Sequence, residues 1–113
     1  MDIPMPFPPL LDDIVSRLAR GLSPERIYLF GSQASGLAGP GSDIDLLIVV
    51  PRSDLPRHRR EALSYDLLWG LTTAVDLVVL TRAEFRRLSK VKTSLAATAK
   101  TKGILLYAQS KTG

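Results

Sequence analysis

The sequence contains no cysteine and only one histidine, His58. The absence of cysteine excludes disulfides, thiolate nucleophiles, and iron–sulfur or zinc-thiolate sites. A single histidine likewise excludes a histidine-rich metal site. The longest uninterrupted apolar run covers residues 46–50, whereas a membrane-spanning helix needs roughly 18 apolar residues. Any metal site in this chain therefore has to be built from oxygen ligands.

The N-terminal segment also lacks the features of an export signal. No Lys or Arg precedes Arg17 and there is no apolar signal core, so we expect a cytoplasmic protein that does not associate with a membrane. Four prolines among the first nine residues predict that residues 1–9 are a flexible segment. At 113 residues the chain has room for one domain, expected over residues 10–108, followed by a flexible tail at 109–113.

Charge is distributed unevenly along the chain. Residues 1–50 carry three basic and six acidic side chains, whereas residues 51–113 carry twelve basic and five acidic ones, giving the net charge of +4. The basic half could attract nucleic acid, nucleotide phosphates or an acidic partner. A solvated basic surface explains the same residues, because the Lys and Arg are spread over several segments. No series of base-stacking aromatic residues accompanies them, so we expect no dedicated nucleic-acid-binding module.

Hydrophobic periodicity and turn residues predict helices and strands in alternation. Predicted helices cover 10–22, 56–70, a short segment at the 81–84 capping box and 94–102, and predicted strands cover 26–30, 43–50, 74–80 and 104–107. Gly21 is expected to end the first helix, and Leu63, Leu67 and Leu71 are expected to form the core-facing stripe of the second. The pattern predicts an α/β (α+β) domain with a single-layer sheet backed by helices.

Two of the predicted strands combine apolar residues with carboxylates. Asp43 and Asp45 begin one strand and, two residues apart, project from the same face, while Asp76 interrupts the strand at 74–80. Paired carboxylates repel each other and are costly to desolvate unless they lie at a wet strand end or bind a cation. Exposed residues at a strand start are one interpretation. If the strands are neighbours, the three carboxylates could instead hold one or two Mg²⁺ ions.

A phosphate-binding segment precedes the carboxylates. Gly31 directly follows a predicted strand and permits close approach of a phosphate to the backbone, and Ser32 offers a hydroxyl and an N–H. Ten residues separate Ser32 from Asp43. A Gly-Ser pair alone would be an ordinary turn, but this pair combined with the spaced Asp43-Ile44-Asp45 and with Asp76 is much more specific.

These motifs resemble the signature of the polymerase-β-like nucleotidyltransferase superfamily, and most closely the minimal nucleotidyltransferases that act as antitoxins to HEPN-domain toxins. The resemblance covers residues 27–107. It implies a small polymerase-β-like fold with a mixed sheet, and Gly31 and Ser32 holding the β- and γ-phosphates of a nucleoside triphosphate. It further implies that Asp43 and Asp45 bind Mg²⁺, and that Asp76 joins a second metal site and helps activate the acceptor hydroxyl.

The resemblance also implies a reaction and a partner. AMP would pass from ATP to a tyrosine of the HEPN toxin, silencing its RNase activity within a toxin–antitoxin complex. The short chain has no further domain to grip an acceptor, so another molecule is expected to present it, with Tyr65 and Trp69 as candidate docking residues or as core residues.

One departure from the family pattern bears on the activity. Members of the family often carry Arg in the loop where this chain has Ser35, and the loss of that Arg would remove a contact to the triphosphate. Neutralisation of the partner by binding alone therefore stays open as an alternative. Transfer to a nucleic-acid or small-molecule acceptor is a third interpretation.

Overall fold

The computed structural model describes residues 9–31, 44–71 and 73–109. Within them, helices and strands follow one another in the predicted order. They are α1 (Pro9–Leu22), β1 (Arg26–Phe30), β2 (Ile44–Val50), α3 (Arg57–Leu67), β3 (Val75–Thr81), α4 (Arg82–Ser89), α5 (Leu95–Lys102) and β4 (Ile104–Ala108). Segment 1–8, the loop 32–43, residue 72 and the tail 110–113 lie outside the described residues.

The four strands form one mixed sheet in the order β3-β2-β1-β4. β1 pairs antiparallel with both β2 and β4, whereas β2 and β3 run parallel. A parallel pair needs a crossover connection, and α3 provides it between β2 and β3. The predicted α+β fold with a mixed sheet is therefore confirmed.

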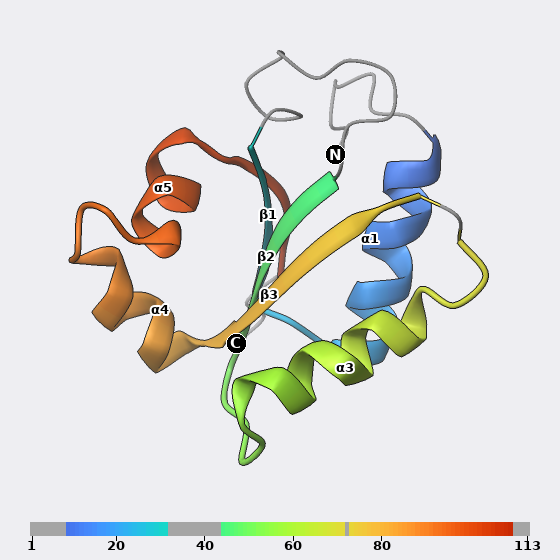
Figure 1. Ribbon diagram of the computed structural model, residues 1–113, viewed down its shortest axis with the longest axis horizontal. Coiled ribbons are helices and arrows are strands. Elements are labelled where there is room, and N and C mark those ends of the chain that lie inside the picture. Colours follow the sequence, from blue (N-terminus) through green and yellow to red (C-terminus); the bar gives the residue numbers. More distant parts are fainter. Residues whose placement is uncertain (1–8, 32–43, 72, 110–113) are drawn as a thin grey trace.

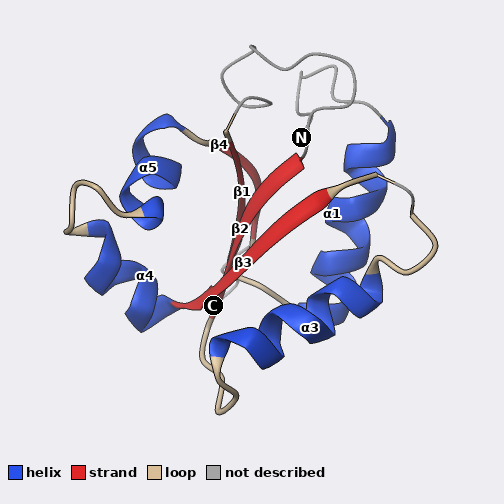
Figure 2. Cartoon of the chain, viewed as in Figure 1, coloured by secondary structure: helices blue, strands red, loops and turns tan. Residues whose placement is uncertain are grey.

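Helices cover both faces of the sheet, with α1 and α3 on one side and α4 and α5 on the other (Figures 1 and 2). The core between α1, α3 and the sheet includes fully buried Ile14, Leu18, Leu46 and Ile48. The core on the other side is smaller, and in it Phe85 of α4 stacks on Tyr28 of β1 with ring centroids 5.6 Å apart. Side chains of β1, β2 and β3 alternate between the two cores, as the period of two requires.

The predicted end of α1 is confirmed to within one residue, and one predicted feature of α3 is wrong. α1 ends at Leu22, one residue after Gly21, and the left-handed residue after it is Ser23, with φ 48°. Gly21 is also a point of close approach, because a Cβ there would lie 2.5 Å from Leu67 Cδ1. The predicted core stripe of α3 fails at Leu63, which is 52% exposed. The face of α3 that turns inward carries Arg60 and Ser64.

The capping box at the start of α4 is confirmed. The Thr81 side chain accepts a hydrogen bond from Glu84 N, and the Glu84 side chain accepts one from Thr81 N. This box makes the turn from β3 into α4 directly, so that α4 begins at the residue after the strand. No helix in the described part of the chain is long and apolar enough to cross a membrane.

Candidate active site

Two of the predicted carboxylates lie side by side in the sheet. In the parallel β2–β3 pair Asp45 is in register with Asp76, and in the antiparallel β1–β2 pair Asp45 is opposite Phe30. Because side chains alternate along a strand, Phe30, Asp45 and Asp76 point to the same face of the sheet as Tyr28, Leu47 and Val49. This is the face that α4 and α5 cover. Asp45 is half-buried and Asp76 is exposed. The two strands therefore present two carboxylates at one end of one face.

Gly31 lies against this pair at the end of β1. Its φ of 76° is in the left-handed region, which glycine adopts without strain. A Cβ added to Gly31 would lie 2.4 Å from Asp45 Oδ2, closer than real Cβ contacts come. Both the conformation and the space thus require glycine, and Gly31 lies directly against the Asp45 carboxylate.

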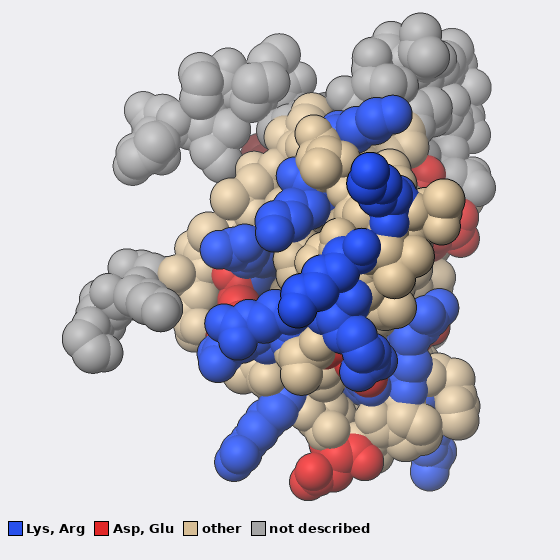
Figure 3. All heavy atoms as spheres, turned by 90° about the vertical axis from the view of Figure 1, so that its left-hand side faces the viewer, with Lys and Arg blue, Asp and Glu red and all other residues tan. Residues whose placement is uncertain are grey.

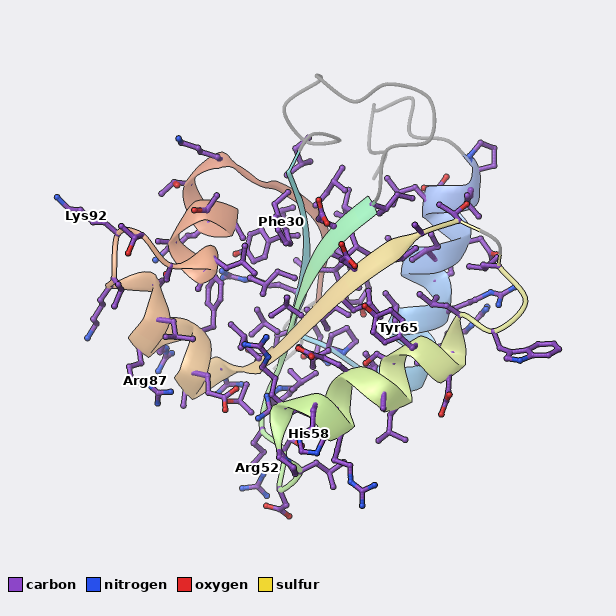
Figure 4. All side chains as sticks on the ribbon, viewed as in Figure 1. Phe30, Arg52, His58, Tyr65, Arg87 and Lys92 are labelled. Atoms are coloured by element: carbon purple, nitrogen blue, oxygen red, sulfur yellow. The ribbon has the colours of Figure 1, made fainter. Side chains whose placement is uncertain are left out.

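The strand that carries Asp76 is an edge strand, and α3 holds it in place. The Tyr65 hydroxyl accepts a hydrogen bond from Leu77 N at 2.9 Å, and Glu61 Oε2 accepts one from Val79 N at 3.1 Å. These two side chains occupy the outward N–H groups of β3, which a bare edge would leave unpaired. Tyr65 and Glu61 therefore hold β3 along the edge that faces away from β2. Figure 4 shows Tyr65 between α3 and the sheet.

A buried arginine anchors the far end of the same strand. Arg60, 8% exposed, donates to Val79 O at 2.8 Å and pairs with Glu84 at 2.7 Å. The hydrogen bond from Arg60, opposed by partial burial and aided by the Thr81 N–H, lowers the pKa of Glu84 from 4.5 to about 2. Sequence reasoning missed Arg60, Glu61 and Glu84 as a connected set. The spacing of four between Glu61 and Tyr65 is the signal that could have found the edge contacts.

The remaining predicted site residues are placed as follows. Ser32 and Asp43, like the departure at Ser35, lie outside the described residues. Trp69 is 85% exposed, so its interpretation as a core residue is wrong, and Tyr65 is 42% exposed although its hydroxyl is bonded. His58 is exposed at the start of α3, and Figure 4 shows it at the same end of that helix as Arg52.

The carboxylate pair fits a hard cation. Its donors are oxygens alone, without cysteine or histidine, which is the set that favours Mg²⁺ over zinc. Mg²⁺ usually takes one or two protein carboxylates and completes its coordination with water and substrate phosphates. Over the described residues no group of three or more His, Cys, Asp or Glu side chains is suited to holding a metal. Asp45 and Asp76 would therefore supply only part of the coordination of an ion, and its other ligands would come from water, substrate phosphates or residues outside the described part of the chain.

Comparison with known proteins identifies the kind of domain that carries this geometry. The sequence matches the nucleotidyltransferase domain family over residues 11–102, which is most of the chain. The chain belongs to this family. The match contains every described helix and strand apart from β4 and the first two residues of α1.

Solved structures with the same fold include other nucleotidyltransferase domains. A protein of Sulfolobus solfataricus described as a nucleotidyltransferase is 25% identical, with a TM-score of 0.65 over 90% of this chain and 80% of that one. A toxin–antitoxin structure with AMP-PNP is 30% identical, with a TM-score of 0.62 over 88% of this chain and 74% of that one. The MntA–HepT toxin–antitoxin structure is 28% identical, with a TM-score of 0.56 over 88% of this chain and 72% of that one.

One curated relative shares a shorter segment with this nucleotidyltransferase domain. The poly(A) polymerase PAPa of Candida albicans is 47% identical over 45 residues, which is 40% of this chain. The aligned segment spans 8% of that polymerase. The likeness is thus to a small part of a much larger enzyme.

Proposed function

We propose that this nucleotidyltransferase domain is a Mg²⁺-dependent protein adenylyltransferase that acts as an antitoxin. It transfers AMP from ATP to a tyrosine hydroxyl of a partner HEPN-domain toxin and thereby neutralises the toxin. The observation that carries the proposal is the register of Asp45 with Asp76 beside Gly31, three strands meeting at one end of one face. Likeness to toxin–antitoxin structures, one of them with AMP-PNP, supports both the nucleotide and the partner.

Each residue of the site has a role that its position suits. Gly31 leaves the backbone open to a phosphate, and the expected hydroxyl of Ser32 would hold the same group. Asp45 and Asp76, together with the expected Asp43, would hold Mg²⁺, which when bound neutralises the charge of the triphosphate. Asp76 is the more exposed carboxylate and lies on the edge strand, so it is the one that an acceptor arriving from solvent meets first.

The transfer is an in-line displacement at phosphorus. The tyrosine oxygen of the acceptor forms a bond to the α-phosphorus of ATP, and the bond from that phosphorus to pyrophosphate breaks. Pyrophosphate leaves with the bonding electron pair, and the phenolic proton passes to Asp76 or to water. Most of the rate enhancement would come from positioning and from stabilising charge in the transition state.

The partner is proposed to dock where α3 ends. Trp69, 85% exposed, is the most exposed large apolar side chain among the described residues. Its carbonyl accepts a hydrogen bond from Arg17 Nη1 at 3.1 Å, so the backbone under the indole is fixed to α1. A rigidly based tryptophan is typical of residues that dominate binding energy in protein interfaces.

The test is a labelling experiment. Purified protein with Mg²⁺ and each α-labelled nucleoside triphosphate is incubated with lysate of the source organism, and labelled proteins are identified by mass spectrometry. We expect one labelled protein from ATP, carrying AMP on tyrosine. Asp45→Asn should abolish the label, whereas Asp54→Asn, an exposed aspartate at the opposite end of β2, should keep it. Labelling that survives Asp45→Asn would contradict the role of this carboxylate.

A second candidate function has one observation in its favour. The identity to a poly(A) polymerase segment suggests transfer to an RNA 3′ end. In the same experiment it would appear as label in RNA and a ladder of extended products. Neutralisation by binding alone would appear as a toxin silenced equally well by wild-type protein and by Asp45→Asn.

A further inference from the structure

A cleft lies at the end of the sheet opposite the carboxylates. Its volume is about 530 Å³, within the range of sites for small ligands. Arg26 begins β1 there, in register with Val49 near the end of β2 and with Ala108 at the end of β4. α4 and α5 line the other side. The cleft is therefore distinct from the site at Gly31, Asp45 and Asp76.

Cations from three separate elements line this cleft. Arg26 of β1, Arg86 of α4 and Lys100 of α5 are exposed, and within the described part of the chain none of them forms an ion pair. Arg82, also in the lining, is held by an ion pair with Glu25. Arg26 Nη1 donates to the Tyr28 hydroxyl at 3.1 Å, which orients its guanidinium. Convergent like charges repel each other, and a bound anion would relieve the repulsion.

The positive charge continues from the cleft over the outer surface of α4 and α5. Residues 82–102 contain seven basic side chains and one acidic one, Glu84, which pairs with Arg60 across the turn. Lys and Arg side chains spread over this whole face in Figure 3, and Arg87 and Lys92 point away from the sheet in Figure 4. A track of cations this long suits a ligand with repeated negative charges better than a single anion.

The composition of the face distinguishes between two possible polyanions, an acidic protein and a nucleic acid. Protein interfaces are enriched in exposed aromatic residues and depleted in lysine at their centres. This face has four lysines, Lys90, Lys92, Lys100 and Lys102, and the exposed aromatic residues of the described chain, Tyr65 and Trp69, belong to the α3 side of the sheet. Without stacking aromatic residues this face cannot hold bases, as expected from the sequence, so its Lys and Arg side chains could contact a nucleic acid only through the phosphate backbone and independently of base sequence.

We infer that the cleft lined by Arg26, Arg86 and Lys100, with the basic face of α4 and α5, binds the phosphate backbone of a nucleic acid. Arginine guanidinium groups form paired hydrogen bonds to phosphate oxygens, so Arg26 and Arg86 are the principal contacts. Lys100 adds a point charge from the opposite wall. The inference goes beyond the proposed transfer reaction, because it concerns the other end of the sheet and needs neither Mg²⁺ nor ATP.

The test measures binding without catalysis. Fluorescence anisotropy of a labelled oligo(A) of about 15 nucleotides is followed with excess EDTA, over a series of salt concentrations. We expect a Kd of roughly 1–100 µM near physiological salt, and unchanged binding by Asp45→Asn. The double variant Arg86→Gln/Lys100→Gln should bind about tenfold more weakly, with a salt slope smaller by about two.

A matched control distinguishes an effect of the cleft residues on binding from an effect of the protein's net charge. Arg20→Gln/Arg59→Gln removes the same charge from exposed positions on α1 and α3, and its affinity should change less than about threefold. Equal loss in both double variants would overturn the assignment of the cleft, as would the absence of binding. Tighter binding of polyglutamate than of the RNA would show that the face receives an acidic protein. Because the catalytic carboxylates play no part, failure here would leave the transfer proposal untouched.

Discussion

The two faces of β2 differ although one strand supplies both. Toward α1 and α3 the strand presents Ile44, Leu46, Ile48 and Val50, all of them buried. Toward α4 and α5 it presents Leu47 and Val49, which are buried, and then Asp45, which is not. The first face is apolar over the whole strand, whereas the second is apolar only as far as Leu47 and carries a carboxylate, Asp45, at the second residue of the strand.

This difference separates the residues of β2 that stabilise the fold from the residue that is a candidate for chemistry. An apolar residue at position 45 would extend the second core by one layer, as Ile44 and Leu46 do on the first face. A carboxylate there adds little burial, and it lies beside a second carboxylate, Asp76. The α1–α3 face therefore buries apolar side chains along the whole strand, and the end of the other face is where we propose that ligands bind.

The largest expected effect comes from Asp45→Asn, which removes charge from the ligand-binding end and keeps the shape. We expect the rate of AMP transfer to fall by roughly 10³-fold, about 4 kcal/mol of barrier, because the carboxylate would no longer hold Mg²⁺. The free energy of unfolding should change by less than about 1 kcal/mol. Labelling rates and urea unfolding measure the two quantities. A variant that unfolds more easily yet transfers AMP normally would reverse the division between the faces.

The next largest effect, on the free energy of unfolding, is expected from a substitution in the apolar face of β2. Leu46 is fully buried, and Leu46→Ala should lower the free energy of unfolding by about 3 kcal/mol through lost burial and a residual cavity. Leu63→Ala is the matched control, since Leu63 is 52% exposed and should cost less than about 1 kcal/mol. Urea denaturation of both variants gives the comparison. Equal destabilisation would mean that Leu63 is packed after all.

Gly31→Ala should affect both stability and activity. The φ of 76° costs a residue with a side chain about 1–2 kcal/mol, and the new Cβ would displace the Asp45 carboxylate. Gly70→Ala imposes a similar φ of 93° with no atom within 4 Å of the new Cβ. We expect both variants to lose comparable stability and only Gly31→Ala to lose transfer activity. Equal activities would show that the contact with Asp45 is unimportant.

A smaller effect depends on pH. Glu84 releases its proton at about pH 4.5 in the unfolded chain and at about pH 2 in the folded one, because Arg60 donates to it. Between these values the unfolded state binds more protons, so the pair stabilises the fold above pH 4.5 and this contribution is lost as the pH falls toward 2. Glu84→Gln should therefore cost about 1–2 kcal/mol at pH 7, allowing for solvent screening, and less at pH 3. Urea unfolding at both pH values measures it, and a cost that grows in acid would contradict the pairing.

Much of the fold could be predicted from the sequence because its signals are local. Runs of apolar residues predicted the two strands that carry Asp45 and Asp76, and the Thr81–Glu84 spacing predicted the start of α4. The register that brings Asp45 beside Asp76 is a property of the parallel pairing, which no local pattern contains. The inward face of α3 was mispredicted for a similar reason. Its buried residues are Arg60 and Ser64. Arg60 can be buried because it donates to the Val79 carbonyl of β3 and to the Glu84 carboxylate of α4.

The smallest expected effect on stability is that of Trp69→Ala. The indole is 85% exposed, and the bond from Arg17 is made to the Trp69 carbonyl, which alanine keeps. The free energy of unfolding should therefore stay within about 0.5 kcal/mol of wild type. Tyr65→Phe, which loses the bond to Leu77 N, should cost about 1 kcal/mol and is the contrast within α3 itself. Urea unfolding distinguishes the two variants.

Co-purification with the labelled partner tests whether the indole binds that partner. A Trp69→Ala protein that folds normally but fails to retain the partner would establish the end of α3 as the docking surface. Undiminished retention would move that surface elsewhere.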